Sequence, residues 1–104
     1  MATTSKTLFR GAAATTNTTL YTVPTISTTT VVTSIAVANT AAAEGTFTIN
    51  IDGVAVLSAV SLAANSTAVI DMKQVLDADA TPKIISGSAS AITINFHISG
   101  VEIV

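Results

Sequence analysis

The chain has 104 residues and no cysteine, so it can bury a core as one domain but forms neither disulfides nor thiolate metal sites. Only 10% of the residues are charged and the formal net charge is −2, which argues against a nucleic-acid partner, because the four cations form no patch: Lys6, Arg10, Lys73 and Lys83. Mean hydropathy is +0.67, yet Thr, Ser, Asn and Asp interrupt every apolar run before the ~20 residues of a membrane-spanning helix.

The polar part of the composition is mostly uncharged Thr, Ser and Asn, and much of the 49% apolar share is Ala. Charged groups oppose association because they must be desolvated, and the centres of protein interfaces are depleted in them. A chain so poor in charge therefore suits a subunit that packs against other subunits. We expect a homo-oligomer; the alternative is a monomer whose surface is hydrophilic through its hydroxyl groups.

Strands are predicted along the whole chain, because β-branched residues dominate it. The first covers about residues 6–14, after a polar and flexible segment 1–6. The second covers 18–23 and ends at Pro24, which has no N–H to donate to a ladder. In the third, Thr29–Asn39, we expect Val31, Ile35 and Val37 to share one face, and 39–45 to be a loop.

A β-hairpin is predicted around Asp52-Gly53, where apolar and polar residues alternate on both sides. This dipeptide favours a two-residue type I′ turn, because that turn needs positive φ at both central positions. The predicted register places Ile51 opposite Val54 and Ile49 opposite Val56, so that all four side chains share one face.

Shorter elements follow the hairpin. Segments 59–62 and 67–72 are predicted strands with Asn65-Ser66 as the turn between them, and Ala68, Ile70 and Met72 should share a face. The stretch Met72–Leu76 has the composition of one short helical turn, which Asp71 would cap. Residues 77–82 read as loop, and 83–89 as a strand.

The last strand has the longest alternation in the chain. Its apolar residues are Ile92, Ile94, Phe96 and Ile98, and after Gly100 the alternation resumes one residue out of step. A slip of this kind at a glycine predicts a β-bulge at Gly100.

Together these patterns predict an all-β fold, an antiparallel β-sandwich of about eight short strands, either jelly-roll or immunoglobulin-like. Residues 1–104 would form a single domain. The order of the strands stays open.

Reactive constellations are absent from the sequence, so we expect no catalytic, cofactor-binding or metal-binding residues and no enzyme activity. His97 is the only histidine and lies on the polar face of the last strand. Residues 77–81 alternate oxygen side chains but lack the glycine and glutamate of a calcium loop. Tyr21 is better read as packing than as a ligand platform. Residues 87–90 read as a small-residue turn, with no nucleophile elbow.

Several stretches resemble small virion proteins of tailed bacteriophages: Thr19–Pro24, Thr30–Thr40, Ile51–Val54, Ser61–Thr67 and His97–Ile103. The resemblance implies a capsid decoration or cement protein that binds and stabilises the assembled shell on its outer surface. Its implied partners are the major capsid protein and copies of itself, without nucleic acid, membrane or small-molecule substrate. The alternatives are a phage tail, fibre or collar component, or a carbohydrate-binding or adhesion β-sandwich. The resemblance supplies no site residues.

Overall fold

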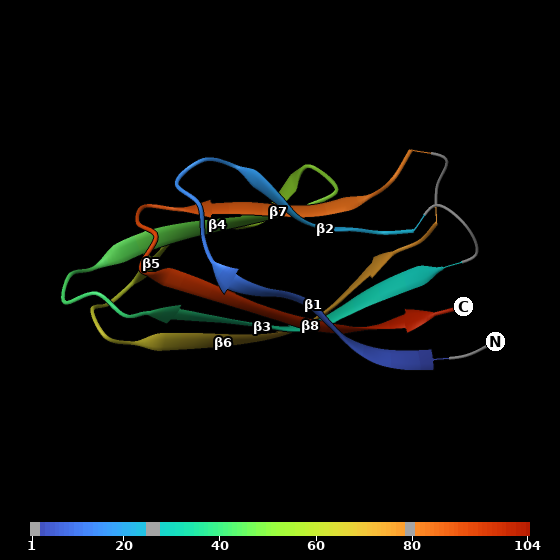
Figure 1. The fold of residues 1–104 in the computed structure, drawn as a ribbon, viewed down its shortest axis with the longest axis horizontal. Coiled ribbons are helices and arrows are strands. Elements are labelled where there is room, and N and C mark those ends of the chain that lie inside the picture. The colour runs from blue at the N-terminus through green and yellow to red at the C-terminus, as the bar shows by residue number, and fades with distance from the viewer. Residues whose placement is uncertain (1–2, 25–27, 79–80) are drawn as a thin grey trace.

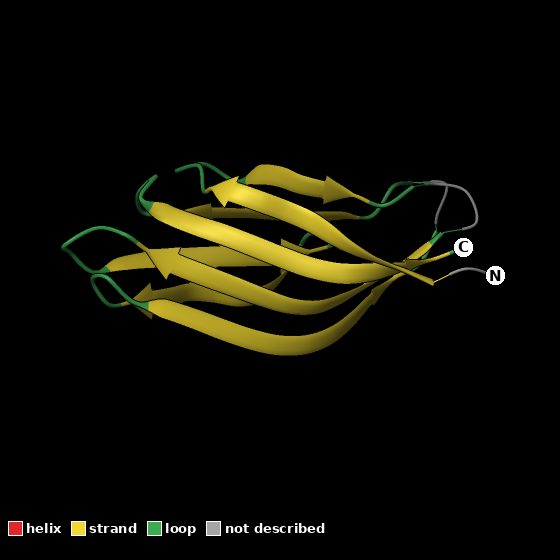
Figure 2. Cartoon of the chain, turned by 60° about the horizontal axis from the view of Figure 1, so that its bottom comes forward, coloured by secondary structure: helices red, strands yellow, loops and turns green. Residues whose placement is uncertain are grey.

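A computed structural model describes residues 3–24, 28–78 and 81–104, and in these ranges every regular element is a strand (Figure 2). The strong representation of Thr, Val and Ile explains this, because their branched side chains fit a pleated surface better than a helix. There are eight strands: β1 (Thr3–Ala12), β2 (Thr18–Thr22), β3 (Thr29–Asn39), β4 (Gly45–Ile51), β5 (Val54–Leu62), β6 (Thr67–Leu76), β7 (Ile84–Ala89) and β8 (Ile94–Ile103).

The strands form two four-stranded antiparallel sheets that lie face to face (Figure 1). Sheet A has the order β1-β8-β3-β6, and sheet B has the order β2-β7-β4-β5. Each of the pairs β1–β8, β2–β7, β3–β6 and β4–β5 belongs to one long hairpin, whose tip is the β4–β5 turn. Rolling this hairpin brings β8 beside β3 and β7 beside β4, which is the topology of a jelly roll. The predicted antiparallel sandwich is confirmed, and the strand order selects the jelly roll over the immunoglobulin-like alternative.

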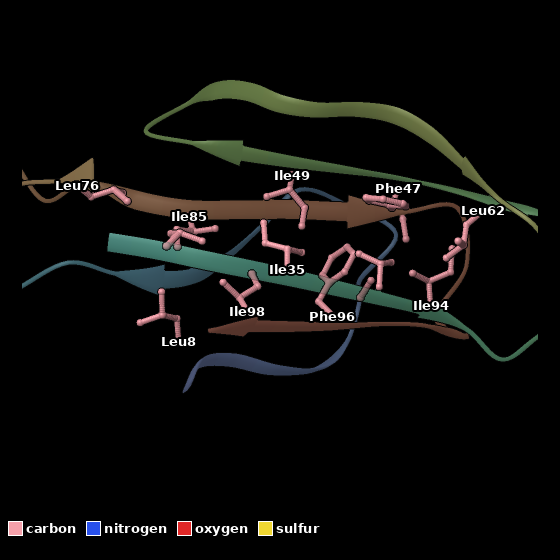
Figure 3. Packing of buried hydrophobic residues seen from close by; sticks show 14 of the residues in the cluster. Leu8, Ile35, Phe47, Ile49, Leu62, Leu76, Ile85, Ile94, Phe96 and Ile98 are labelled. Carbon is pink, nitrogen blue, oxygen red and sulfur yellow. The ribbon is translucent and has the colours of Figure 1, made fainter. Parts of the chain in front are cut away.

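The core fills the space between the sheets with branched and aromatic side chains (Figure 3). Phe47 of sheet B meets Phe96 of sheet A edge to face, with ring centroids 6.1 Å apart. Ile49 and Ile94 have no exposed surface. Truncating either to alanine should cost about 2–5 kcal/mol of stability, because the neighbours cannot fully close the cavity.

The β4–β5 turn has the predicted geometry, with φ of 54° at Asp52 and 78° at Gly53. Ile51 pairs with Val54 as predicted, but Ile49 pairs with Leu57 and not with Val56. The register changes because β5 carries two more residues than β4, and the pairing shifts at two places to accommodate them. Segment 59–62, predicted as a separate strand, is part of β5.

The bulge predicted at Gly100 lies instead in the two neighbouring strands. Two residues lack a partner on an unbroken β8: Leu8 of β1, passed over opposite Ile98 and Ser99, and Thr33 of β3, passed over opposite Ser99 and Gly100. Gly100 points inward like Ile98, and a Cβ there would lie 2.3 Å from the Val31 carbonyl oxygen and 2.9 Å from Leu8 Cδ1. A glycine is therefore needed at this position because the backbone of Val31 and the side chain of Leu8 come close to it, and not because β8 bulges there.

The extra residue at Thr33 also corrects the predicted faces of β3. Val32, and not Val31, shares the buried face with Ile35 and Val37, because one residue of β3 has no partner between them. Farther along the chain, Ala68, Ile70 and Met72 do pack against the core as predicted.

Two local predictions are wrong because sheet pairing overrides local composition. Met72–Leu76 belongs to β6 and pairs with β3, so Asp71 lies within a strand and caps no helix. Gly87–Ala89, read as part of a turn, belongs to β7 and pairs with β4, and β7 confirms the strand predicted over 83–89. Strand β1 begins earlier than the predicted residue 6, because Thr3–Lys6 pairs with Gly100–Ile103 of β8. Residues 1–2 of the segment predicted to be flexible lie outside the described part of the chain.

Candidate functional site

The outer face of sheet A is the largest regular surface of the molecule. Its four strands have 10 or 11 residues each, whereas those of sheet B have 5 to 9. The pairing register places its outward side chains in four rows, read from β1 through β8 and β3 to β6: Ser5-Val101-Val31-Val75, Thr7-Ser99-Ser34-Asp71, Arg10-His97-Ala36-Val69 and Ala12-Asn95-Ala38-Thr67. We call these rows the A face.

Charge is sparse on the A face. Of its row positions only Arg10 and Asp71 are charged, and they lie on the two opposite edge strands. Lys73, also exposed on β6, falls in the stretch where the β3–β6 pairing is irregular. The two middle strands, β8 and β3, present Val, Ser and Ala side chains with one His and one Asn, so the middle of the face is weakly hydrated.

A shallow depression of about 350 Å³ opens on this face, over β8 between the bulges of β1 and β3. Its lining consists of Ser5, Lys6, Thr7, Thr33, Ser99, Gly100 and Val101. These groups offer hydroxyls, backbone and one ammonium, with no acid–base pair for catalysis. The depression is open to solvent, unlike the concave pockets that enclose small ligands.

A polar cluster closes the end of the sandwich where both chain termini lie (Figure 1). Tyr21 reaches from sheet B and donates its hydroxyl proton to Glu102 of β8, and its oxygen lies 3.3 Å from Thr30 Oγ1 of β3. Lys6 Nζ lies 3.3 Å from the Glu102 carboxylate and 5.7 Å from the centre of the Tyr21 ring. We call Lys6, Tyr21, Thr30 and Glu102 the terminal cluster.

The register explains why these residues meet. Thr30 lies directly opposite Glu102 on the inward face, and Lys6 lies diagonally from it, opposite Gly100. The hydrogen bond from Tyr21, and then Lys6, hold the pKa of Glu102 below its usual 4.5 against the opposing effect of burial. Burial, and then the bond to Glu102, raise the pKa of Tyr21 above 10.0. The cluster therefore keeps the carboxylate ionised and the phenol neutral, which is a structural pairing of the two sheets.

The residues considered for chemistry from the sequence lie apart from one another. His97 is exposed on the A face, between Arg10 of β1 and Ala36 of β3. Asp77 pairs with Lys83, which lowers the pKa of Asp77, and Asp79 lies outside the described residues. Tyr21 is half-buried packing, as predicted, but it also belongs to the terminal cluster.

Over residues 3–24, 28–78 and 81–104, no three His, Asp or Glu side chains gather as metal ligands would. In the same ranges no helix has the length and apolarity needed to cross a bilayer.

The terminal cluster is what sequence reasoning missed. Lys6 and Glu102 are 96 positions apart, so spacing gives no sign of their contact. One signal was present: if Gly100 continues the inward series Ile94, Phe96, Ile98, then Glu102 also points inward and needs a partner.

Comparison with known proteins bears on the fold. No protein-family model and no curated protein matches the chain. Among solved structures, a chain in the crystal structure of the T13 IBDV viral particle is similar, with a TM-score of 0.58 and 12% sequence identity. This chain shares its fold with part of a virus particle. The match covers 97% of this chain but only 30% of that one, so the chain spans less than a third of its neighbour's length.

At 12% identity the likeness shows the fold alone. It agrees with the predicted β-sandwich. The neighbour comes from IBDV, so the assignment to tailed bacteriophages stays a prediction based on the resemblance of residues.

Proposed function

We propose that the chain is a non-enzymatic structural protein of a virus particle, a decoration or cement protein that binds the outside of the assembled shell of a tailed bacteriophage. The A face supports this most directly, because it offers a broad, charge-poor surface suited to packing against another subunit of an assembly, and no enclosed pocket. The jelly roll that it shares with part of the IBDV particle is a fold used for viral shells.

The physical role follows from mass action. A protein that binds only the assembled lattice lowers the free energy of the assembled state by an amount that grows with its concentration. Such binding needs contact area repeated over many copies, not a reactive side chain. The partners would be the major shell protein and other copies of this chain.

Co-sedimentation tests the proposal. Purified chain is mixed with assembled shells that lack it, and in parallel with dissociated shell subunits. We expect it to pellet with shells only, to saturate at many copies per shell, and to raise the temperature at which shells open. Saturation at a few copies on one vertex would instead indicate a tail, fibre or collar component. Binding to glycans and not to shells would indicate an adhesion module, and either result would overturn the proposal.

A further inference from the structure

We infer that two copies of the chain associate through their A faces, about a two-fold axis that runs parallel to the strands between β8 and β3. This deepens the self-association in the proposed function, and it concerns contacts between copies, not contacts with a shell.

The size of the A face fits a dimer interface. Four strands of ten or eleven residues cover about 19 × 33 Å, or roughly 600 Å² per copy. Two such faces together bury about 1,200 Å² or more, at the lower end of the range for specific, stable complexes. Sheet B, with shorter strands, offers less.

The rows of the A face are self-complementary under this axis. The operation keeps each row at its own level and reverses its order, so that Val101 packs on Val31 of the second copy and the reverse. In the third row the larger His97 meets the small Ala36 of the second copy. In the fourth row Asn95 meets Ala38 of the second copy in the same way. Large side chains facing small ones allow two sheets to interdigitate at close distance.

The two edge charges complement each other under the same axis. Within one copy, Arg10 and Asp71 lie on opposite edges of sheet A, about 14 Å or three strand spacings apart. Neither has an ion-pair partner among the described residues. The axis places β1 over β6 of the second copy, and the two residues then lie one row apart, within reach of the arginine side chain. Two symmetric pairs result.

Mixing two charge-reversal variants tests this arrangement by sedimentation. Arg10→Glu alone and Asp71→Lys alone each place like charges at both contacts, so each should weaken the dimer roughly tenfold or more. An equimolar mixture should restore it, because a heterodimer carries an opposite-charge pair at both contacts. Since the two residues cannot meet within one chain, this recovery requires two copies facing each other.

A second pair of variants tests the face itself. Ala36→Glu puts a charge at the centre of the A face and should give a monomer that still unfolds cooperatively. Ser88→Glu, at the matching outward position on an inner strand of sheet B, should leave the dimer intact. A wild-type chain that stays monomeric at every attainable concentration, an oligomer insensitive to Ala36→Glu, or a mixture that fails to recover would each overturn the inference. None of these results bears on co-sedimentation with shells, which tests the proposed function separately.

Discussion

In the terminal cluster, the charged groups of Glu102 and Lys6 and the phenol of Tyr21 connect the two sheets. At the opposite end of the sandwich, a neutral side-chain amide connects the loops. There the Asn39 side chain, 3% exposed, donates to the carbonyl oxygens of Ala43, Leu62 and Ala63 and accepts from Ala41 N–H. In the terminal cluster, by contrast, the Lys6 side chain is 46% exposed.

This difference predicts which end of the sandwich depends on pH for its stability and which end does not. The hydrogen bonds of the buried Asn39 amide have no titrating partner, and removing the amide takes away the side-chain donor of three loop carbonyl oxygens. A half-exposed ion pair contributes little at neutral pH and less when its carboxylate is protonated. We therefore expect the end with the termini to be the weaker and the acid-sensitive one.

Of the side chains at the two ends of the sandwich, Asn39 should have the largest effect. Asn39→Ala removes the side-chain donor of three carbonyl oxygens, of which Ala63 O keeps the Ser66 hydroxyl, and the acceptor of the Ala41 N–H, which should lower the free energy of unfolding by about 2 kcal/mol. The matched control is Asn50→Ala, whose amide donates only to exposed Asn17 and whose loss should cost less than about 0.5 kcal/mol. Chemical denaturation of both variants measures the difference, and equal losses would contradict the role assigned to Asn39.

A smaller effect is expected at Glu102. Glu102→Gln removes the charge that Lys6 and Tyr21 contact, and should cost about 1 kcal/mol at neutral pH. Because the folded-state pKa of Glu102 lies below its value of 4.5 in the unfolded chain, its contribution is complete above that pH and is lost as the pH falls through the folded pKa. Stability measured against pH should therefore fall less steeply in acid for Glu102→Gln than for the parent.

Asp77 provides the control for this acid effect. Lys83 lowers the pKa of Asp77, so its contribution is also lost on acidification, but it lies outside the terminal cluster. Asp77→Asn should flatten the acid limb independently, and the two flattenings should add. An acid limb unchanged by Glu102→Gln would contradict the assignment of acid sensitivity to the cluster.

The smallest effect is a change in the titration of Tyr21, the only tyrosine in a chain without tryptophan. Ultraviolet absorbance should show it ionising above pH 10.0. Glu102→Gln should lower this midpoint in part, because burial, the larger cause, remains. Thr30→Val should raise it, because the bond from Thr30 favours the phenolate. Shifts of the same sign in both variants would contradict the hydrogen-bond pattern of the cluster.

Much of the fold follows from local signals, and the rest depends on contacts between distant segments. The Asp52-Gly53 dipeptide determines the type of its turn, and the alternation in 67–72 determines which side chains of that strand face the core. Both are therefore predictable from the local sequence. The extra residues Leu8 and Thr33 carry no such sign, because a bulge there depends on how β1 and β3 pass Gly100 of β8. Asn39 and the terminal cluster escaped prediction for the same reason: their partners lie in other strands and loops.

Electron microscopy of the particles that carry this protein tests the central claim most directly, namely that this jelly roll acts through its outer surface on an assembled shell. The account predicts jelly-roll density repeated over the shell exterior at lattice-related positions. Density confined to a tail or a single vertex, or shells that lack the protein altogether, would contradict it.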